Sequence, residues 1–307
     1  MAQTTLTRAG PAHHLLRVSD LDAAQVEWLL DMARAMKSSP NGWIRTLAGT
    51  TLACFFEKPS TRTRVSFAAA AQRLGMLPLL LRPDELQLGR GEPIADTARV
   101  LSSYAAGIVI RTFAQETIEQ VAAAADVPVI NALSDEHHPC QALADVLTLR
   151  ERFGRLEGLK LAYVGDGNNV ANSLIEAGRL TGIEIVVAAP PGFGPTIPGA
   201  EVVEDPREAV AGAHAVYTDV WVSMGDEVER DRRLRELEPY QVDSELMSLA
   251  RPDAVFLHCL PAHRGEEVAN EVIDGYQSVV WQQAANRLPT EQALLYGLIA
   301  RAPGLEL

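Results

Sequence analysis

The chain has 307 residues, a length that suits two α/β domains better than a single core. Lys and Arg number 27 against 40 Asp and Glu, so the net charge is −13 (27 − 40), which disfavours binding to nucleic-acid phosphates and leaves small anionic ligands possible. No apolar run approaches membrane-spanning length, the segment MAQTTLTRAGPAHHLL contains no apolar h-region and the three cysteines form no CxxC, so we expect a cytoplasmic protein without disulfides, zinc ribbon or membrane partner.

Short β-rich segments alternate with helical segments in the first half of the chain. This alternation predicts right-handed βαβ units and a parallel sheet. The predicted strands are Thr51–Phe56, Leu77–Leu81, Ile108–Arg111 and Pro128–Asn131. The predicted helices are Arg64–Leu74, Asp96–Tyr104, Thr117–Ala125 and Pro139–Phe153.

The second half repeats the alternation after a boundary near Arg155–Gly158. Its predicted strands are Lys160–Val164, Ile183–Ala188, Ala215–Thr218, Val255–His258 and Ser278–Trp281. The helices predicted here include Val170–Leu180 and Pro289–Ala300, and a Pro/Gly loop at 190–199 lies between strand and helix. We therefore expect two doubly wound α/β domains, 1–150 and 151–286, each a parallel sheet flanked by helices. Residues 287–307 are expected to pack back on the first domain, and the active site to lie in the cleft between the two.

The segment Phe55–Phe67 carries the strongest chemical signal. A predicted strand ends just before Pro59, and the helix after it opens with Ser60, Thr61, Arg62, Thr63 and Arg64. A helix N-terminus offers unpaired N–H groups, and the hydroxyls and guanidinium groups add donors, so this point can hold a phosphate. The alternative is an ordinary Ser/Thr cap with solvated arginines, although capping alone needs neither two threonines nor two arginines.

The sequence DEHHPCQALAD is the second signal. Pro139 suits a first helical turn, which puts His138 directly before a helix. Because strand ends and helix starts gather at one edge of a parallel sheet, His138 and Gln141 are expected to join Arg62 and Arg111 there. A histidine pair on the surface is the alternative. His-x-x-Gln lacks a further ligand at zinc spacing, so no metal is predicted.

A Gly165-x-Gly167 turn follows the strand that opens the second half. A dinucleotide fingerprint would have a third glycine at Val170 and an acidic residue after the next strand, and both are missing. We interpret the segment as a tight turn that presents Asn168 and Asn169 at a helix N-terminus, where a carboxylate can bind.

Two further segments follow predicted strands. In TDVWVSMG, Asp219 and Ser223 can hold an ammonium group, and a solvated loop is the alternative. In FLHCLPAHRG, Cys259 and the backbone around it reach the same sheet edge, although a cysteine at a strand end is more often packing. Arg287, at the predicted start of the last helix, would add a guanidinium to the cleft.

Together these motifs resemble the aspartate/ornithine transcarbamoylase family over nearly the whole chain. Ser-Thr-Arg-Thr at 60–63 and His-Pro-x-Gln at 138–141 are similar to motifs shared by much of that family. Ser-Met-Gly at 223–225 and His-Cys-Leu-Pro at 258–261 resemble the members that act on ornithine rather than aspartate. The family's His-Pro-Thr-Gln appears here with Cys140 in third place, whose role stays open.

The resemblance implies transfer of a carbamoyl group from carbamoyl phosphate to the δ-amine of L-ornithine, giving L-citrulline and phosphate for arginine biosynthesis, without cofactor or metal. The carbamoyl-phosphate residues that it implies are Ser60, Thr61, Arg62, Thr63, Gln87, Arg111, His138, Gln141, Cys259, Leu260 and Arg287. The implied ornithine residues are Asn169, Asp219, Ser223 and Met224. The implied catalytic group is Arg62, Arg111, His138, Cys259 and Arg287.

The resemblance further implies trimers or multiples of trimers, in which Gln87 of one subunit reaches a neighbouring site. Two alternatives stay open at this point. One is a sister transcarbamoylase that uses putrescine or N-acetylornithine. The other is a non-catalytic nucleotide-binding module built on the Gly-x-Gly turn, which would leave Ser60–Arg64 and His138 without a role.

Overall fold

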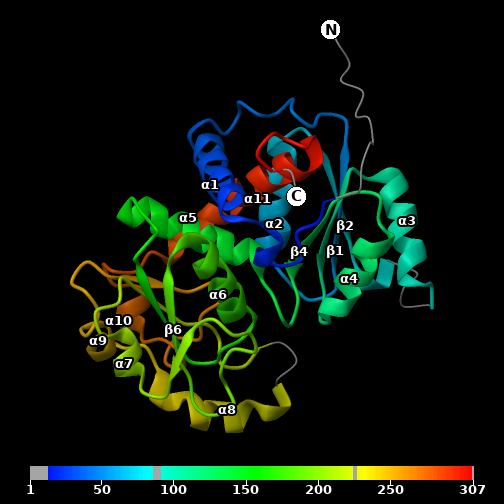
Figure 1. Cartoon of the computed structure of the whole chain (residues 1–307). Coiled ribbons are helices and arrows are strands. Elements are labelled where there is room, and N and C mark those ends of the chain that lie inside the picture. The colour runs from blue at the N-terminus through cyan, green and yellow to red at the C-terminus, as the bar shows by residue number, and fades with distance from the viewer. Residues whose placement is uncertain (1–12, 86–90, 224–226, 306–307) are drawn as a thin grey trace.

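Two parallel β-sheets, each with helices on both faces, make up the molecule (Figure 1). The computed structural model describes residues 13–85, 91–223 and 227–305. The first sheet has the order β2-β1-β3-β4, with β1 Thr51–Phe56, β2 Leu77–Leu81, β3 Gly107–Arg111 and β4 Val129–Leu133. The second has the order β7-β6-β5-β8-β9, with β5 Lys160–Val164, β6 Glu184–Ala188, β7 Glu201–Val203, β8 Ala215–Tyr217 and β9 Val255–Leu257. The predicted fold class is confirmed.

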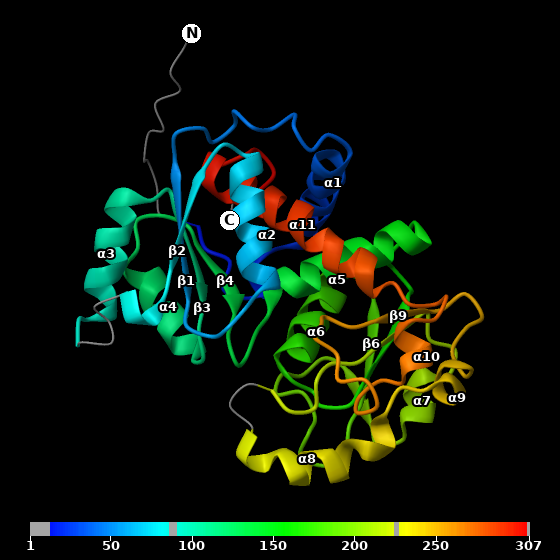
Figure 2. The same cartoon turned by 180° about the vertical axis from the view of Figure 1, so that it is seen from behind.

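Alternating side chains explain why helices cover both faces. In β1, Leu52, Cys54 and Phe56 enter one hydrophobic cluster, whereas Ala53 and Phe55 enter another on the opposite face. This two-residue period is that of a strand buried on both sides. On one face of the first sheet lie α3 (Ile94–Tyr104) and α4 (Gln115–Ala124). On the other lie α1 (Ala23–Ser38), α2 (Arg62–Arg73) and α11 (Val280–Ala300) (Figure 2).

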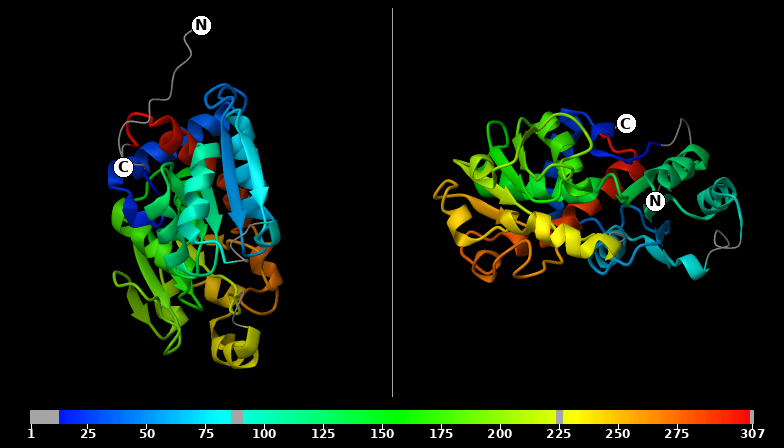
Figure 3. Two further views of the ribbon diagram at one scale, coloured as in Figure 1. Left: turned by 90° about the vertical axis from the view of Figure 1, so that its right-hand side faces the viewer. Right: turned by 90° about the horizontal axis from the view of Figure 1, so that it is seen from below.

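The second sheet follows the same rule. Leu161 and Tyr163 of β5 point into the cluster that includes α6 (Asn169–Thr181), and Ala162 and Val164 point into the cluster that includes α7 (Pro206–Val210). The short helices α9 (Ser244–Met247) and α10 (Asn270–Ile273) join the α7 side, and α8 (Arg230–Leu237) lies at the far end of this half (Figure 3). Within the described residues, no helix is both long and apolar enough to cross a membrane.

Two long helices run between the halves. One is α5 (Pro139–Phe153), which follows β4 and leads into β5, and the other is α11, which packs against α1, α2 and α5. A polar seam joins three of these helices: Lys37 of α1 and Asn286 of α11 both bond Glu151 of α5, and Asn286 also donates to Thr148. Helices α5 and α11 therefore both lie at the junction between the two halves.

Three predictions about the second half are wrong. Ser278–Trp281 is not a strand: Ser278 makes only an isolated bridge to Phe256, and α11 begins at Val280. The last helix starts nine residues before Pro289, which lies inside it, so Arg287 occupies the helix interior rather than its start. The loop at 190–199 leads into the short edge strand β7, not into a helix.

Candidate active site

A cavity of about 610 Å³ lies between the two halves, at the carboxyl ends of both sheets. Parallel strands end there and the helices after them begin there, so backbone donors and polar side chains converge. All residues that the resemblance assigns to a substrate, and that lie within the described part of the chain, line this cavity: Ser60, Thr61, Arg62, Thr63, Arg111, His138, Gln141, Asn169, Asp219, Ser223, Cys259, Leu260 and Arg287. Arg64, whose guanidinium was also expected to add donors for the phosphate, does not line it and stacks over the Phe56 ring instead. Gln87 and Met224 lie outside the described residues.

The N-terminus of α2 forms one wall of the cavity. The helix begins at Arg62 with Thr61 as its N-cap, two residues earlier than predicted. The Thr61 side chain makes no capping bond, which leaves its hydroxyl for a ligand. The free N–H groups and positive dipole end of the first turn favour an anion at this wall.

Three guanidinium groups, those of Arg62, Arg111 and Arg287, line the cavity close enough to one another for their charges to interact. Burial, followed by the charges of Arg287 and Arg62, lowers the pKa of Arg111 to about 10. Burial also lowers the pKa of Arg62, and Arg287 adds to the effect. The Nε atom of Arg111 is buried without a hydrogen-bond partner. A cluster of like charges that depress one another's pKa is stabilised by a bound anion, so this part of the site is built for one.

Arg287 is the most firmly held of the three. Its Nη1 donates to Gln141 Oε1 at 2.7 Å, and its Nη2 donates to Thr63 Oγ1 at 3.3 Å and to Glu291 Oε1 at 2.7 Å. Burial alone would lower the pKa of Arg287, but the Glu291 carboxylate one helical turn away raises it. The guanidinium is therefore a fixed cation, oriented by helices α2, α5 and α11 together.

His138 is the N-cap of α5, with φ −134° and ψ 64°, so the predicted position directly before this helix is confirmed. The residue is buried, and its Nδ1 has no hydrogen-bond partner. Burial lowers the pKa of His138 well below its usual value, and the nearby Arg287 and Arg111 charges lower it further. The imidazole is thus neutral at physiological pH, able to donate from one nitrogen and accept at the other.

The second sheet supplies the opposite wall of the cavity. Asn168 caps α6 through a bond from Val170 N, as expected from the tight-turn interpretation, and its Nδ2 donates to Asp219 Oδ2 at 2.8 Å. Cys259 Sγ donates to the other oxygen of Asp219 at 2.9 Å. Leu260 has φ 59°, a left-handed conformation uncommon outside glycine and frequent at functional sites.

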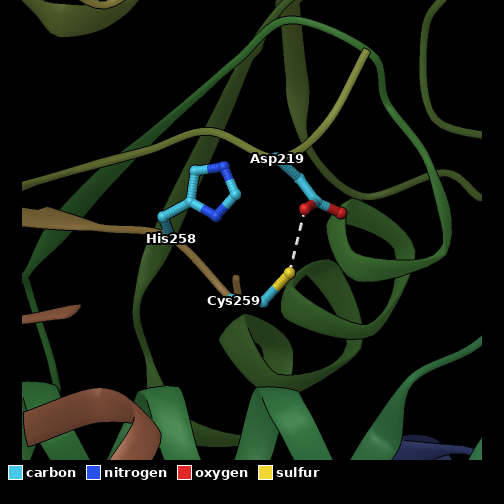
Figure 4. A group of neighbouring side chains, drawn as sticks. All are labelled: Asp219, His258 and Cys259. Carbon is cyan, nitrogen blue, oxygen red and sulfur yellow. Dashed lines mark hydrogen bonds between the residues drawn. The ribbon is translucent and has the colours of Figure 1, made fainter. Parts of the chain in front are cut away.

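Asp219, His258 and Cys259 bring three metal-type ligand atoms within 4.8 Å of one another (Figure 4). Both ring nitrogens of His258 already have protein partners, since Leu260 N donates to Nδ1 at 2.9 Å and Nε2 lies 3.2 Å from Glu267 Oε1. Burial raises the pKa of the Cys259 thiol well above its usual value, and the Asp219 carboxylate raises it further. A metal ligand would be a thiolate, so this donor set fits a hydrogen-bonded scaffold rather than a metal site.

The Gly-x-Gly turn is closed to a nucleotide pyrophosphate. Gly167 N donates to Phe193 O at 2.7 Å, and a side-chain carbon at Gly167 would lie 2.5 Å from Pro195 N. The intervening Asp166 forms an ion pair with Arg233 of α8. The glycine therefore allows close packing of the 193–195 loop instead of approach by a cofactor.

Several cavity residues were not predicted as site residues. Lys58 and Asp135 both line the cavity and form an ion pair, and the Lys58 ammonium lies 4.4 Å from the centre of the Phe113 ring. Lys58 lies within the segment Phe55–Phe67 and Asp135 opens DEHHPCQALAD, so their positions in these two motifs were the available signal. Asp166, inside the Gly-x-Gly turn, and His263, inside FLHCLPAHRG, also line the cavity, and the same kind of signal was available for them.

Asp145, on α5 behind the cavity, is a fully buried carboxyl group that joins the two halves. It accepts from Gln141 Nε2 at 2.8 Å, from Gln283 Nε2 of α11 at 2.7 Å and from the Tyr217 hydroxyl of β8 at 3.1 Å. Burial raises its pKa to about 7, although these three hydrogen bonds act in the opposite direction. The folded protein thus holds a proton on Asp145 at a pH where the unfolded chain has lost it.

The stability of the protein should fall as pH rises from about 4 to about 7 through the contribution of Asp145, because an aspartate in the unfolded chain titrates near pKa 3.9. Asp145→Asn keeps the shape of the side chain but cannot ionise, so its contribution to the pH dependence of stability is lost. Denaturant unfolding of both proteins at pH 5 and pH 7.5 measures this effect. The buried histidines, whose lowered pKa values act in the opposite sense, are common to both proteins and cancel. An identical pH dependence in the two proteins would contradict the assignment.

The comparisons with known proteins cover both halves of the chain. Residues 13–151 match the family model of the aspartate/ornithine carbamoyltransferase carbamoyl-P binding domain, and residues 157–298 match that of the Asp/Orn binding domain. The ornithine carbamoyltransferase of Methanocorpusculum labreanum is 48% identical over 298 residues, covering 93% of this chain and 98% of the relative. That of Gloeobacter violaceus is 50% identical over 299 residues, covering 93% and 95%.

Solved structures give the same result. The ornithine carbamoyltransferase from Pyrococcus furiosus superposes with a TM-score of 0.89 at 47% identity, covering 94% of this chain and 97% of that one. The structure from Thermus thermophilus has a TM-score of 0.88 at 45% identity, covering 95% and 100%.

Proposed function

We propose, from the premise that this chain belongs to the aspartate/ornithine carbamoyltransferase family, that it transfers the carbamoyl group of carbamoyl phosphate to the δ-amine of L-ornithine. The products are L-citrulline and phosphate, a step of arginine biosynthesis. One observation carries the proposal beyond family membership: a single cavity has a cluster of arginines and a helix N-terminus at one wall and the Asp219 carboxylate at the other. Such a cavity suits one substrate with a phosphate and another with an ammonium group.

The phosphate of carbamoyl phosphate binds at the first wall, held by Ser60, Thr61, Arg62, Thr63 and Arg111. Charge-assisted hydrogen bonds from Arg62 and Arg111 then stabilise the phosphate dianion as it leaves. The carbamoyl oxygen faces the groups that fix its position and polarise it: His138, Gln141, Arg287 and the backbone at Cys259 and Leu260. Arg287 is suited to this because its orientation is fixed before the substrate arrives.

Ornithine binds at the second wall. Asp219 pairs with its α-ammonium, and Asn169 with the N-terminus of α6 binds its α-carboxylate. Ser223 and Met224 complete this pocket. The neutral δ-amine attacks the carbamoyl carbon, a C–N bond forms, the C–O bond to phosphate breaks and the amine loses a proton. No enzyme nucleophile is needed, and the raised pKa of the Cys259 thiol suits it to holding Asp219 rather than to attack.

The two walls of the cavity suggest that each domain binds one of the two substrates. We assign carbamoyl phosphate to residues 1–150 together with the helix at about 287–307, and ornithine to residues 151–286. The two matched family models and the packing of α11 against α1, α2 and α5 support this division.

Phosphate release from carbamoyl phosphate tests the function directly. Ornithine, aspartate, putrescine and N-acetylornithine are compared as acceptors at equal concentration. We expect ornithine to be the preferred acceptor. Preference for putrescine or N-acetylornithine would move the chain to a sister activity, and no release with any amine would refute the proposal.

We also propose that the enzyme assembles as a trimer, or as multiples of trimers, in which Gln87 enters a neighbouring site. The strand β2 is an edge of the first sheet and exposes Leu77, Leu79 and Leu80, and Val65 of the adjacent α2 is 61% exposed. Exposed apolar side chains on an open sheet edge favour association with another chain. Because Gln87 follows this strand closely in sequence, such an association supports its proposed reach into a second subunit.

Subunit mixing tests this arrangement. Gln87→Ala and Arg111→Ala are each expected to be nearly inactive, but reassembled mixtures should regain activity, because some sites then combine an intact Arg111 with an intact Gln87 from the neighbour. The matched control mixes Arg62→Ala with Arg111→Ala. Both of these residues line the cavity of one chain, so that mixture should regain nothing. Hybrids of verified composition that stay inactive in the first mixture would count against a shared site.

A further inference from the structure

One face of α6 is a stripe of polar side chains. Asn169, Asn172, Ser173 and Glu176 follow one another at spacings of three, one and three residues, which places them on the same side of the helix. Three of the four, Asn172, Ser173 and Glu176, are buried, and Ser173 is 0% exposed. Buried polar groups on a helix need partners, so this face has to meet complementary groups elsewhere.

Three of its residues have partners in the segment 134–138, which ends in His138 and precedes α5, and Asn172 also exchanges hydrogen bonds with Thr196. Asn169 Nδ2 donates to Ser134 O at 2.5 Å, and Asn172 Nδ2 donates to Glu136 O at 3.0 Å. The Ser173 hydroxyl accepts from His138 N at 2.7 Å. Ser134, Glu136 and His138, every second residue of the segment, are thus hydrogen-bonded to α6. A helix of the second half therefore holds a segment of the first half in place.

Glu176 extends the contact by one turn. Its carboxylate accepts from Val18 N at 2.9 Å and from the Ser19 hydroxyl at 2.8 Å, both in the turn η1 (Val18–Asp20). It also lies 3.8 Å from His137 Nδ1. Glu176 therefore joins η1 to the face of α6 that holds the segment before His138.

The bond from His138 N to Ser173 is the anchor that α6 adds to the His138 backbone, whose carbonyl already accepts from Gln141 N and Ala142 N of α5. The His138 ring has no capping bond to α5, and its buried Nδ1 has no hydrogen-bond partner. The location of the imidazole in the cavity consequently depends on where its backbone is anchored. Small displacements of a reacting group are costly, because the barrier depends on alignment.

We infer that Ser173 is a positioning residue for His138 and that the polar face of α6 links the ornithine end of the site to the carbamoyl end. This inference rests on the proposed function. The helix that opens with Asn169, assigned to the ornithine carboxylate, also carries the side chain that anchors His138. The placement of both the ornithine contact and His138 therefore depends on one helix.

The chain offers a closely matched control for a test of this inference. Ser173 donates to Asn169 O four residues earlier at 2.9 Å and accepts from a backbone N–H. Ser102 of α3 does the same: it is buried, donates to Ala98 O at 2.8 Å and accepts from Asp126 N at 3.1 Å. Ser102 does not line the cavity. The two serines therefore share their structural chemistry and differ in what they anchor.

Ser173→Ala should lower kcat by about ten-fold or more while leaving KM for ornithine within about two-fold, because alignment is lost and the ornithine contacts are kept. Both variants should lower Tm by similar amounts, because each loses the same kinds of hydrogen bond. Ser102→Ala should leave kcat unchanged. Imidazole NMR of protein labelled with ¹⁵N at histidine should show the His138 signals shifted in Ser173→Ala and unchanged in Ser102→Ala.

Unchanged kcat and unchanged His138 signals in Ser173→Ala, or equal losses of kcat in both variants, would overturn the inference. Failure of the proposed function would look different, because the wild-type protein would then release no phosphate with ornithine. The NMR comparison reports on the anchoring of His138 in either case.

Discussion

Arg62→Ala should weaken the binding of carbamoyl phosphate by roughly 30-fold to several thousand-fold, the equivalent of about 2–5 kcal/mol for a lost charge-assisted contact to a desolvated ligand. Arg62 lies at the first position of α2, lines the cavity and is close enough to Arg111 and Arg287 for their charges to interact. Its side chain is exposed, so folding should be little affected. Calorimetric titration with carbamoyl phosphate, and with inorganic phosphate as a stable second probe, gives the affinity.

Arg64→Ala is the matched control for this measurement. Arg64 lies two residues later on the same helix, stacks over the Phe56 ring at 5.2 Å from its centre and does not line the cavity. Loss of this charge should change the affinity by no more than about three-fold, the size of a screened, indirect effect. If both variants bind carbamoyl phosphate like the wild type, the phosphate assignment at α2 is wrong. Equal losses would point to general attraction instead of direct contact.

The inner strands of the sheets were predictable because they are buried on both faces and therefore form short apolar runs bounded by turn residues, and the exposed edge strand β2 is a similar apolar run. The predicted bounds of β1, β2 and β5 agree with the structure. The three-residue edge strand β7 was not predicted, since it has only the pairing with β6 to define it. The sequence pattern was least informative at Ser278–Trp281, where one apolar run spans the end of a loop and the start of a helix. Ser278 makes an isolated β-bridge to Phe256, whereas the buried Val280 is already the first residue of α11.

Pro289 misled the interpretation of the last helix because proline normally marks a first turn. In α11 it lies in the interior, buried, at the cost of the hydrogen bond that its missing N–H would have made to the preceding turn. Packing of α11 against α1, α2 and α5 compensates for that loss. The same packing explains how Arg287 reaches Gln141 and Thr63, contacts between residues 146 and 224 positions apart that no local pattern contains.

The site motifs could be predicted because the carboxyl ends of parallel strands lie at one edge of a sheet, so residues just after predicted strands are candidates without knowledge of the tertiary structure. The residues that hold these site residues in place could not be predicted. Ser173 and Glu176 look like ordinary residues of an amphipathic helix, and only the packing of α6 against the segment 134–138 and against η1 gives them partners outside the helix. Asp145 is similarly unremarkable in sequence, and its raised pKa is a consequence of complete burial between the halves.

Asp219→Asn should reduce kcat/KM for ornithine by roughly 30-fold to several thousand-fold, because the α-ammonium loses its only assigned counter-charge in a desolvated site, a loss of about 2–5 kcal/mol. Asparagine keeps the size of the side chain. It also keeps an oxygen for one of the two existing donors, Asn168 Nδ2 and Cys259 Sγ, so the loop should stay folded. Affinity for carbamoyl phosphate, which is assigned to the opposite wall, should change little.

N-acetylornithine separates the charge effect from general damage. It keeps the α-carboxylate but carries a neutral amide in place of the α-ammonium, so the wild-type enzyme should use it far less well than ornithine, since the Asp219 carboxylate would stay unpaired. In Asp219→Asn the kcat/KM for ornithine should fall much further than the already low kcat/KM for N-acetylornithine, which narrows the ratio of the two values. A variant that merely distorted the cavity would lower both values together and would also weaken carbamoyl phosphate binding. An ornithine value equal to that of the wild type would show that Asp219 is not the ammonium partner, and the preference for ornithine over its sister substrates would then need a different residue.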